Sequence, residues 1–472
     1  MKRILILLGC ATLLTGCNVY RQFERPEVET DSLFGHDVRA VDTASIASLP
    51  WTELFTDTKL QALIKEGLAN NTDLGIARWR VEEAKATLFS SRLAYLPSLS
   101  LNPQGQLSRQ VTSRQADEGN PLVNSSTRSS SATYNIAASA EWEVDIFGRL
   151  TNAKRGAKAA LEQSVAYQQA VRTQLIATIA NGYYNLLTLD RQLDISRRTA
   201  VSWDEILRTY EAKLRVGEAT AAAVAQAKAS KLAVEGQVLT LEKQIRAQEN
   251  SLSALLGRVP GSIERATLEG QSFPEHLAVG VPLQLLDRRP DVRQAEAALA
   301  QAFYNTNAAR AAFYPSITLS GQAGWTNTNG AVIMNPGSWL LNAIGSLTQP
   351  LFNRGRNIAN LRIAKARQEE AVLSFRQSLL KAGNEVNDAL AQWQTADSRL
   401  GIDREQVEAL RVAVDNTTKL MQYSNQASYL EVLTARQSLL QAELTEANDT
   451  FDKIQGVINL YHALGGGCSP YD

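Results

Sequence analysis

The chain has 472 residues, enough for several domains, and its charges cancel, with 48 lysines and arginines against 48 aspartates and glutamates. This balance leaves no basic footprint, so we predict no nucleic-acid partner. After the N-terminus no apolar run is long enough for a transmembrane helix. A membrane β-barrel stays open, because its strands give a far weaker signal.

The sequence lacks recognisable motifs for catalysis, phosphate binding or metal binding. The three histidines, His36, His276 and His462, are scattered and lack the spacing of a metal site. There is no glycine-rich phosphate loop after a strand and no nucleophile elbow. We therefore predict no enzymatic activity, no cofactor and no metal site.

Residues 1–16 have the form of a secretory signal peptide. A basic start precedes an apolar run, Ile4 to Leu14, that is too short to span a bilayer. The run leads into a motif that resembles the lipobox of bacterial lipoproteins, Leu14-Thr15-Gly16-Cys17. By that resemblance Cys17 is the lipidated first residue of the mature chain, and two or three acyl chains anchor a protein stably. The alternative is an ordinary signal peptide with an incidental cysteine.

Residues 17–72 begin as a polar tether and continue as an amphipathic equatorial segment that opens at Trp51. Asp73 then predicts the N-cap of a helix that Pro97 ends. The apolar positions of this helix alternate steps of three and four, as in a coiled coil: Leu74, Ala77, Val81, Ala84, Leu88 and Tyr95.

The same segment returns 218 residues later, which predicts two similar halves. Ala94-Tyr95-Leu96-Pro97-Ser98-Leu99 corresponds to Ala312-Phe313-Tyr314-Pro315-Ser316-Ile317, and Asp73 corresponds to Asp291. We place the first repeat at 73–256, an equatorial linker at 257–290, the second repeat at 291–464 and a C-terminal tail at 465–472.

After each proline the hydrophobic period changes from helical to two, which predicts β-strands 98–108, 131–145, 316–326 and 338–351, the last alternating poorly. One face is apolar and the other carries Ser, Thr, Asn and Gln, as a water-filled lumen would. A β-sandwich also has alternating strands. Four aromatic residues, Tyr134, Trp142, Trp325 and Trp339, are candidates for interfacial belts and favour the barrel.

Four strands cannot close a barrel, because even small barrels use about eight. An open sheet in lipid would leave backbone groups at its edges unpaired, at a cost of several kcal/mol each. The count of strands therefore predicts assembly, with each protomer contributing four.

Two proline-free stretches, Leu150–Val216 and Asn353–Asn425, predict helices of roughly 100 Å at about 1.5 Å per residue. Each is followed by a second helical stretch. The second stretch of one half lies 208 residues along the sequence from that of the other half. We therefore expect two long helical hairpins, 150–256 and 353–464, and a mixed but mainly α fold.

Three segments resemble the TolC-like outer-membrane efflux proteins, and most closely their lipoprotein branch, the OprM- and NodT-like proteins: Trp51-Thr52-Glu53-Leu54-Phe55, Leu256-Gly257-Arg258-Val259-Pro260-Gly261, and Val281 to Val292 with its Asp287-Arg288-Arg289-Pro290-Asp291. The resemblance covers essentially the whole mature chain. It implies a homotrimer in the outer membrane of a Gram-negative bacterium, with a twelve-stranded β-barrel and a twelve-helix α-barrel that extends into the periplasm. It also implies a periplasmic adaptor protein and an inner-membrane pump of the RND or a similar type as partners, and passive conduction of drugs or other small solutes.

The resemblance implies two sites. Adaptor-contacting hairpin tips fall on Arg215, Val216, Gly217, Glu218 and Ala219 in the first half and on Ser424, Asn425, Gln426 and Ala427 in the second. A periplasmic gate, where some members of the family have two aspartates, falls on Glu431 and Thr434, with Ala223 and Gln226 in the first half. Turn geometry alone also explains Gly217 and Asn425, and Glu431 is equally typical of a solvated helix surface.

Two other functions fit parts of the sequence. The heptads and Cys17 suit a purely structural coiled-coil lipoprotein, although such a protein has no use for alternating strands. An outer-membrane duct for type I protein secretion is the alternative within the family.

Overall fold

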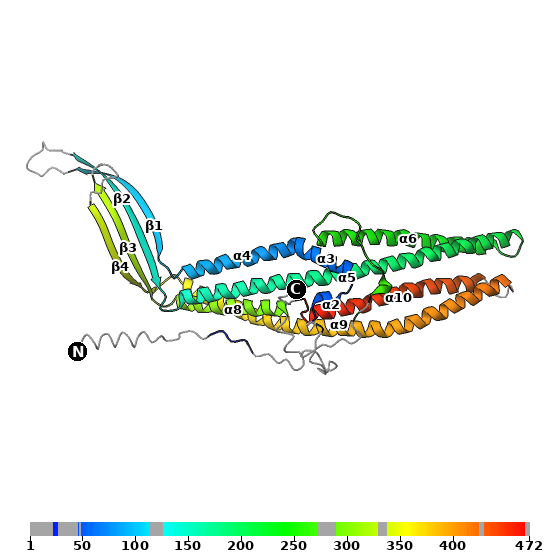
Figure 1. Cartoon of the computed structure of the whole chain (residues 1–472). Helices are drawn as coiled ribbons and strands as arrows, with labels where there is room; N and C mark the ends of the chain where they lie inside the picture. The colour runs from blue at the N-terminus through cyan, green and yellow to red at the C-terminus, as the bar shows by residue number, and fades with distance from the viewer. Residues whose placement is uncertain are drawn as a thin grey trace, which may run out of the picture. The chain divides into compact units, whose positions relative to one another are not determined.

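The computed structural model describes residues 22–26, 46, 49–113, 126–271, 273, 289–328, 338–423 and 429–467 (Figure 1). The chain divides into two compact units. The sheet unit comprises Met1–Arg25, Glu83–Leu161 and Ala297–Val372, and the helical unit comprises Pro26–Glu82, Glu162–Glu296 and Leu373–Asp472.

The sheet unit is organised around one antiparallel sheet of four strands in the order β1-β2-β3-β4. The strands are β1 (Ser98–Ser113), β2 (Ser126–Val144), β3 (Ser316–Thr328) and β4 (Ser338–Thr348). All four predicted strands are present. The first two are paired further than the alternation predicts, up to Ser113 opposite Ser126, because backbone hydrogen bonds continue the ladder where the apolar pattern ends.

The long helices pair as two hairpins. α5 (Arg149–Arg215) is followed by α6 (Ala221–Leu255), and α9 (Arg356–Tyr423) is followed by α10 (Tyr429–Ala463). Each proline-free stretch therefore forms a single helix, 67 residues long in α5 and 68 in α9. None of the described helices combines the length and the hydropathy needed to cross a membrane.

Shorter helices precede each strand pair. α2 (Trp51–Leu54) and α3 (Thr58–Asn70) lead into α4 (Thr72–Leu93), and the short η2 (Leu268–Gly270) comes before α8 (Pro290–Ala311). The order helix, two strands, two long helices thus occurs twice along the chain. Along α4 the predicted coiled-coil stripe is inside: four of its residues are buried, Leu74, Ala77, Val81 and Leu88.

The N-cap predicted for α4 is wrong by two residues. Asn71, not Asp73, occupies the cap, because its side-chain oxygen accepts a hydrogen bond of 3.0 Å from the Leu74 backbone N–H. Asp73 instead lies in the first turn, where its negative charge faces the positive end of the helix dipole.

Two clusters of buried residues hold the helical unit together. The larger one joins α2 and α3 to the middle of α5 and the end of α10, with Phe55, Ile64, Tyr183, Tyr184 and Ile458 at its centre. The smaller one lies towards the hairpin tips and includes residues of all four long helices: Trp203, Tyr210, Ala223, Ala227, Met421 and Val432. Both clusters bury side chains in the stripes that long helices present to each other.

Candidate conduit surface, hairpin tips and gate

The strand register gives the sheet two chemically distinct faces. Opposed residues share a face, so Leu101, Ala138, Ala323 and Leu341 form one apolar row across all four strands. The neighbouring row is Ser100, Ser139, Gln322 and Asn342, which is polar throughout. The alternation predicted strand by strand is therefore aligned across the whole sheet.

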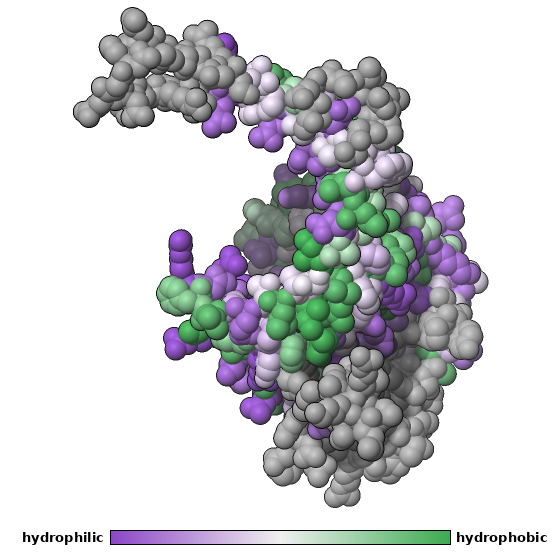
Figure 2. All heavy atoms as spheres, turned by 90° about the vertical axis from the view of Figure 1, so that its left-hand side faces the viewer, coloured by the Kyte–Doolittle hydropathy of each residue, from purple (hydrophilic) through white to green (hydrophobic). Residues whose placement is uncertain are grey.

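The apolar face is uncovered. Leu341 is 87% exposed, and other large apolar side chains of this face are exposed with it: Leu99, Leu101, Leu107, Val111, Leu319, Trp339 and Leu347. Figure 2, which looks from the strand side of Figure 1, shows hydrophobic residues gathered between polar ones. An apolar patch of this kind in a soluble monomer is rare and marks contact with lipid or protein.

The four aromatic residues that are candidates for interfacial belts all lie on the apolar face, as the register shows. Trp325 and Trp339 are directly opposed, and their rings meet edge to face with centroids 6.3 Å apart. At the other end of β2 the Trp142 indole donates a hydrogen bond of 2.9 Å to the Tyr95 carbonyl. An aromatic ring with one polar atom suits the boundary between lipid and water.

Hydroxyl and amide groups on the polar face contact one another between neighbouring strands. Ser100 and Ser139 lie 2.7 Å apart, Asn102 donates to Ser139 at 3.0 Å, and Ser108 and Ser131 lie 2.8 Å apart. Leu340 and Ile344 of β4 are apolar exceptions on this face, which explains why the fourth run alternates poorly. The face resembles the wall of an aqueous passage.

The edges of the sheet are the other notable feature. Within the described residues β1 pairs only with β2, and β4 pairs only with β3. Each edge strand therefore presents backbone N–H and C=O groups along one side. In lipid these backbone groups need protein partners, because no water is present to form hydrogen bonds with them.

The first hairpin tip has a geometry that only a few residues tolerate. Gly217 has φ +80°, and the backbone N–H groups of Gly217 and Glu218 donate to the carbonyls of Leu214 and Lys213 at 3.1 and 2.8 Å. This is a Schellman motif, which closes the C-terminus of α5. Thr220 then caps α6 by accepting a hydrogen bond from the Ala223 N–H. The predicted turn is confirmed here, whereas contact with an adaptor remains a prediction.

The tip also exposes an apolar side chain. Val216 is 71% exposed, while Ala219 packs against the smaller buried cluster. Arg215 ends α5. The second predicted tip, Ser424 to Ala427, lies outside the described residues, as does the lipidation site Cys17.

The two predicted gate residues lie at the start of α10. Glu431 is exposed in its first turn, and Thr434 is exposed one turn further on. Thr434 and its first-half counterpart Gln226 line one groove of about 750 Å³ between α6 and α10. Every residue that lines this groove is uncharged, and glutamine is the most frequent type among them: Gln226, Gln237, Gln406, Gln437 and Gln441. Ala223, the counterpart of Glu431, is buried instead.

Contacts near the tips join the first hairpin to the second, and no sequence pattern indicates them. The Tyr210 hydroxyl of α5 lies 3.0 Å from the Met421 sulfur of α9, and Lys213 donates to the Met421 carbonyl at 3.1 Å. Arg436 of α10 contacts the hydroxyl of Ser202 in α5. Burial lowers the pKa of Arg436.

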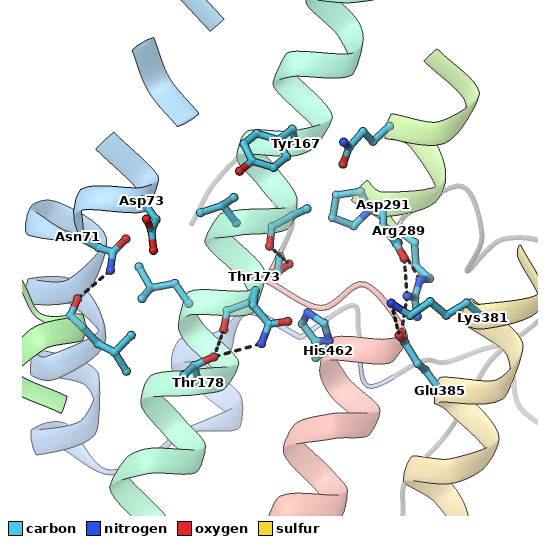
Figure 3. A pocket seen from close by; sticks show the side chains of 17 residues that line it. Asn71, Asp73, Tyr167, Thr173, Thr178, Arg289, Asp291, Lys381, Glu385 and His462 are labelled. Carbon is cyan, nitrogen blue, oxygen red and sulfur yellow. Dashed lines mark hydrogen bonds and ion pairs between the residues drawn. The ribbon is translucent and has the colours of Figure 1, made fainter. Parts of the chain in front are cut away.

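A charged cluster, which we call the Arg289 hub, accounts for the described part of the Asp-Arg-Arg-Pro-Asp segment, Arg289 to Asp291 (Figure 3). The Arg289 side chain is buried and donates to both oxygens of Asp291 at 2.9 and 2.7 Å, to Glu385 at 2.6 Å and to the Ala463 carbonyl at 2.6 Å. One guanidinium thereby joins the start of α8, the middle of α9 and the end of α10. Planar guanidinium groups suit such multiple contacts.

The hub perturbs the groups beside it. Burial opposes the charge of Asp291, but the hydrogen bonds and the charge of Arg289 outweigh it and lower the pKa of that carboxyl. Burial and the nearby Arg289 cation lower the pKa of His462, so its imidazole is neutral at pH 7. These residues line a cavity of about 510 Å³.

The first half has a neutral version of the same connection. Asn71 lies 218 residues before Arg289, and its amide donates a hydrogen bond of 2.9 Å to the Leu255 carbonyl at the end of α6 (Figure 3). Leu255 lies 208 residues before Ala463, so both partners of the bond occupy repeat-related positions. The structure brings Asn71, Asp73, Arg289 and Asp291 to one cavity.

A two-faced sheet joined to long helical hairpins defines a class of membrane-conduit proteins, and comparison with known proteins gives the family. A sequence profile described as outer membrane efflux protein matches residues 63–258 and 281–466. The chain is 30% identical over 462 residues to the cation efflux system protein CusC of Escherichia coli K12, covering 97% of this chain and 98% of that protein. It is 29% identical over 472 residues to the probable outer membrane lipoprotein SilC of Salmonella typhimurium, covering 99% and 98%.

A solved structure agrees. The fold matches the open state of the MtrE outer membrane channel of Neisseria gonorrhoeae with a TM-score of 0.83 and 28% identity, covering 96% of this chain and 99% of that one. The chain therefore belongs to the outer membrane efflux protein family, and its place is the outer membrane. The predicted family, fold class and location are confirmed.

Proposed function

We propose that this protein is the exit duct of a tripartite efflux system and that it carries small solutes passively from the periplasm to the outside. The observation that supports this most is the sheet. Its apolar face suits lipid, its polar face suits water, and both of its edges lack partners among the described residues. Such a sheet is one part of a barrel wall.

Closure requires further copies of the chain. Three protomers would supply twelve strands, with β4 of one copy paired to β1 of the next, and every edge would then be hydrogen-bonded. We also propose that acyl chains on Cys17 anchor each copy to the membrane once the signal peptide, residues 1–16, is removed. The repeats, 73–256 and 291–464, would form the two similar halves of each protomer.

The hairpin tips are the proposed docking points for a periplasmic adaptor, which in turn would hold an inner-membrane pump. The first tip has a rigid turn at Gly217 and an exposed apolar Val216, a combination that suits contact with another protein. Ser424, Asn425, Gln426 and Ala427 are proposed as the corresponding contacts of the second hairpin.

At the start of α10, we propose a gate ringed by three copies of Glu431. Thr434 lines the uncharged groove beside it, so the acidic ring would be single. Like charges at a constriction repel one another and favour cations over anions.

The names of the relatives indicate which compounds a test of the substrate should include. CusC is named for cation efflux, so metal cations belong in the test panel beside drugs. Deleting the gene is expected to sensitise cells to several chemically unrelated toxic compounds, and a plasmid copy should restore resistance. Unchanged sensitivity across the panel, with the pump expressed, would argue against efflux.

A further inference from the structure

A pair of carboxylic acids lies buried where the two helices of the second hairpin meet. Asp449 of α10 is 2% exposed and Asp403 of α9 is 8% exposed. Their carboxyl groups lie within hydrogen-bonding reach of each other. The Oδ2 atom of each is buried and has no hydrogen-bond partner among the residues that the structure describes. Two carboxylates in hydrogen-bond contact cannot both be ionised at low cost, so a proton between them is the simplest explanation.

Other ion pairs between α9 and α10 join opposite charges. Arg411 and Glu443 lie 2.9 Å apart, Lys453 and Asp397 lie 2.5 Å apart, and Arg404 and Glu446 lie 3.9 Å apart. Asp403 and Asp449, by contrast, bring two groups of the same charge together in this seam. The pair therefore differs in kind from its neighbours.

The surroundings neutralise the pair only in part. The Arg399 guanidinium of α9 approaches Asp449 Oδ2 to 2.9 Å, but it is half exposed and the contact lacks hydrogen-bond geometry. Asp452 on α10 adds a further negative charge. The contact from α5 next to Asp449 is neutral, because Gln192 donates a hydrogen bond of 2.7 Å to the side chain of Asn448. One half-exposed cation thus faces up to three carboxylates, so it does not balance all of them.

The first hairpin supplies an internal comparison. The positions 208 residues before Asp403 and Asp449 are Ile195 and Leu241, which are both buried, Leu241 in the larger hydrophobic cluster. The hairpin geometry is therefore compatible with an apolar pair at this place. The acid pair costs stability there unless it is protonated, so its presence calls for a role that an apolar pair lacks.

We propose that Asp403 and Asp449 hold one proton between them and that this proton locks α9 to α10, so that the second hairpin loosens when the proton leaves. The device is a pH-sensitive clasp between two helices, and the first hairpin has apolar residues in its place. This inference does not depend on what the duct conducts.

The direction of the pH effect follows from the shift of Asp449. Burial, and then the hydrogen bond with Asp403, raise the pKa of Asp449 to about 6. The pKa of an unfolded aspartate is about 3.9. Because the folded pKa is the higher one, the stabilisation is complete below about pH 4 and is lost as the pH rises through about 6. Above about pH 7 the shared proton no longer contributes to the stability of the hairpin.

Hydrogen exchange of the full-length, detergent-purified protein tests the clasp. After correction for intrinsic exchange rates, opening of α9 and α10 around the pair is expected to rise about tenfold from pH 5 to pH 7.5, the effect of one proton with these pKa values. Amides around Ile195 and Leu241 of the first hairpin should change much less. Asp449→Asn should remove the pH dependence of the second hairpin, since it holds its amide proton at every pH.

A second variant guards against a folding defect. Asp403→Ile with Asp449→Leu copies the first hairpin, and it should be closed at both pH values. If Asp449→Asn and the double variant keep the wild-type pH dependence, the proposal is wrong. If EDTA alone opens the wild-type hairpin at pH 5, a metal ion rather than a proton joins the carboxylates, and the proposal is equally overturned.

Discussion

The first hairpin, α5 with α6, and the second, α9 with α10, have nearly the same helix lengths, 67 and 35 residues against 68 and 35. They differ in the chemistry between the helices. Where the first half has Asn71, Ile195 and Leu241, the second has Arg289, Asp403 and Asp449. One backbone arrangement thus accommodates a neutral interior and a charged one.

This difference indicates which half of the protomer is suited to respond to changes in pH and salt concentration. Apolar contacts vary little with pH or salt, whereas buried charges depend on their partners and their protons. The exposed acid of the proposed gate, Glu431, also belongs to the second hairpin, and its counterpart Ala223 is buried. We therefore expect the first half to be mainly a support and the second half to be the adjustable part.

The largest effect is expected at the Arg289 hub. Arg289→Ala would leave Asp291 and Glu385 without their shared cation and should destabilise the protein by about 3–5 kcal/mol. The first-half substitution Asn71→Ala removes a cap and one hydrogen bond and should cost only about 1–2 kcal/mol. Guanidinium chloride unfolding followed by tryptophan fluorescence measures both.

The hub also offers a matched control. Arg289→Asn with Glu385→Ala installs the residues found at Asn71 and Ala177 of the first half, and it removes the cation together with one acid. This double variant should recover part of the stability lost in Arg289→Ala. Equal losses in the two would show that the charges are not what distinguishes the halves.

A smaller effect is expected at Gly456, where α10 packs closely against the backbone of α9. A Cβ at Gly456 would lie 2.9 Å from the Trp393 backbone, whereas a Cβ at Gly182 of α5 would meet only side-chain atoms of Leu252 and Gln248. Gly456→Ala should therefore cost about 1–3 kcal/mol through overpacking. Gly182→Ala should be milder in the same unfolding experiment, because side chains can turn away. A reversed order would contradict the close backbone contact.

At the first tip, a substitution of Gly217 is expected to act only through the backbone conformation. Gly217 has φ +80°, and a Cβ added there would have no neighbouring atom within 4 Å, so Gly217→Ala should cost about 1–2 kcal/mol of local strain. Gly217→Asn, the residue at position 425 of the second tip, should be tolerated better. Local hydrogen exchange at residues 213–220 measures the strain, and resistance to toxic compounds reports adaptor docking. Equal strain in the two variants would show that the positive φ at Gly217 does not determine the stability of the tip.

The smallest effect on stability, and a selective effect on transport, is expected at Glu431. Its removal in Glu431→Ala should leave unfolding unchanged, since the side chain is exposed. In a planar bilayer the variant should lose part of its preference for cations over anions. Glu218→Ala, at the first tip, is the matched control, and an identical response of both variants would make Glu431 an ordinary surface residue.

The parts that can be predicted from sequence are those with local signals. Pro97 and Pro315 mark where a helical period gives way to a period of two, and the long helices contain no proline to interrupt them. The predicted bounds of the first two strands are shorter than the observed ones because Ser, Arg and Gln beyond Leu107 pair through their backbones without an apolar pattern.

The parts that could not be predicted depend on residues distant in the sequence. Asn71 and Asp73 are equally good caps, and the choice of Asn71 involves the Leu255 carbonyl, 184 residues away. Asp403 and Asp449 each lie among charged residues of an amphipathic helix, and only the pairing of α9 with α10 buries them together. The Arg289 hub likewise needs three helices to meet.

The central claim is that a chain with too few strands to close a barrel shares one wall with copies of itself around an aqueous passage. Reconstitution of the detergent-purified protein into a planar bilayer, with the mass of the particle measured on the same sample, tests it most directly. We predict a particle of three chains that produces stepwise ionic currents. A single-chain particle, or a bilayer that stays electrically silent under every condition, would contradict the account.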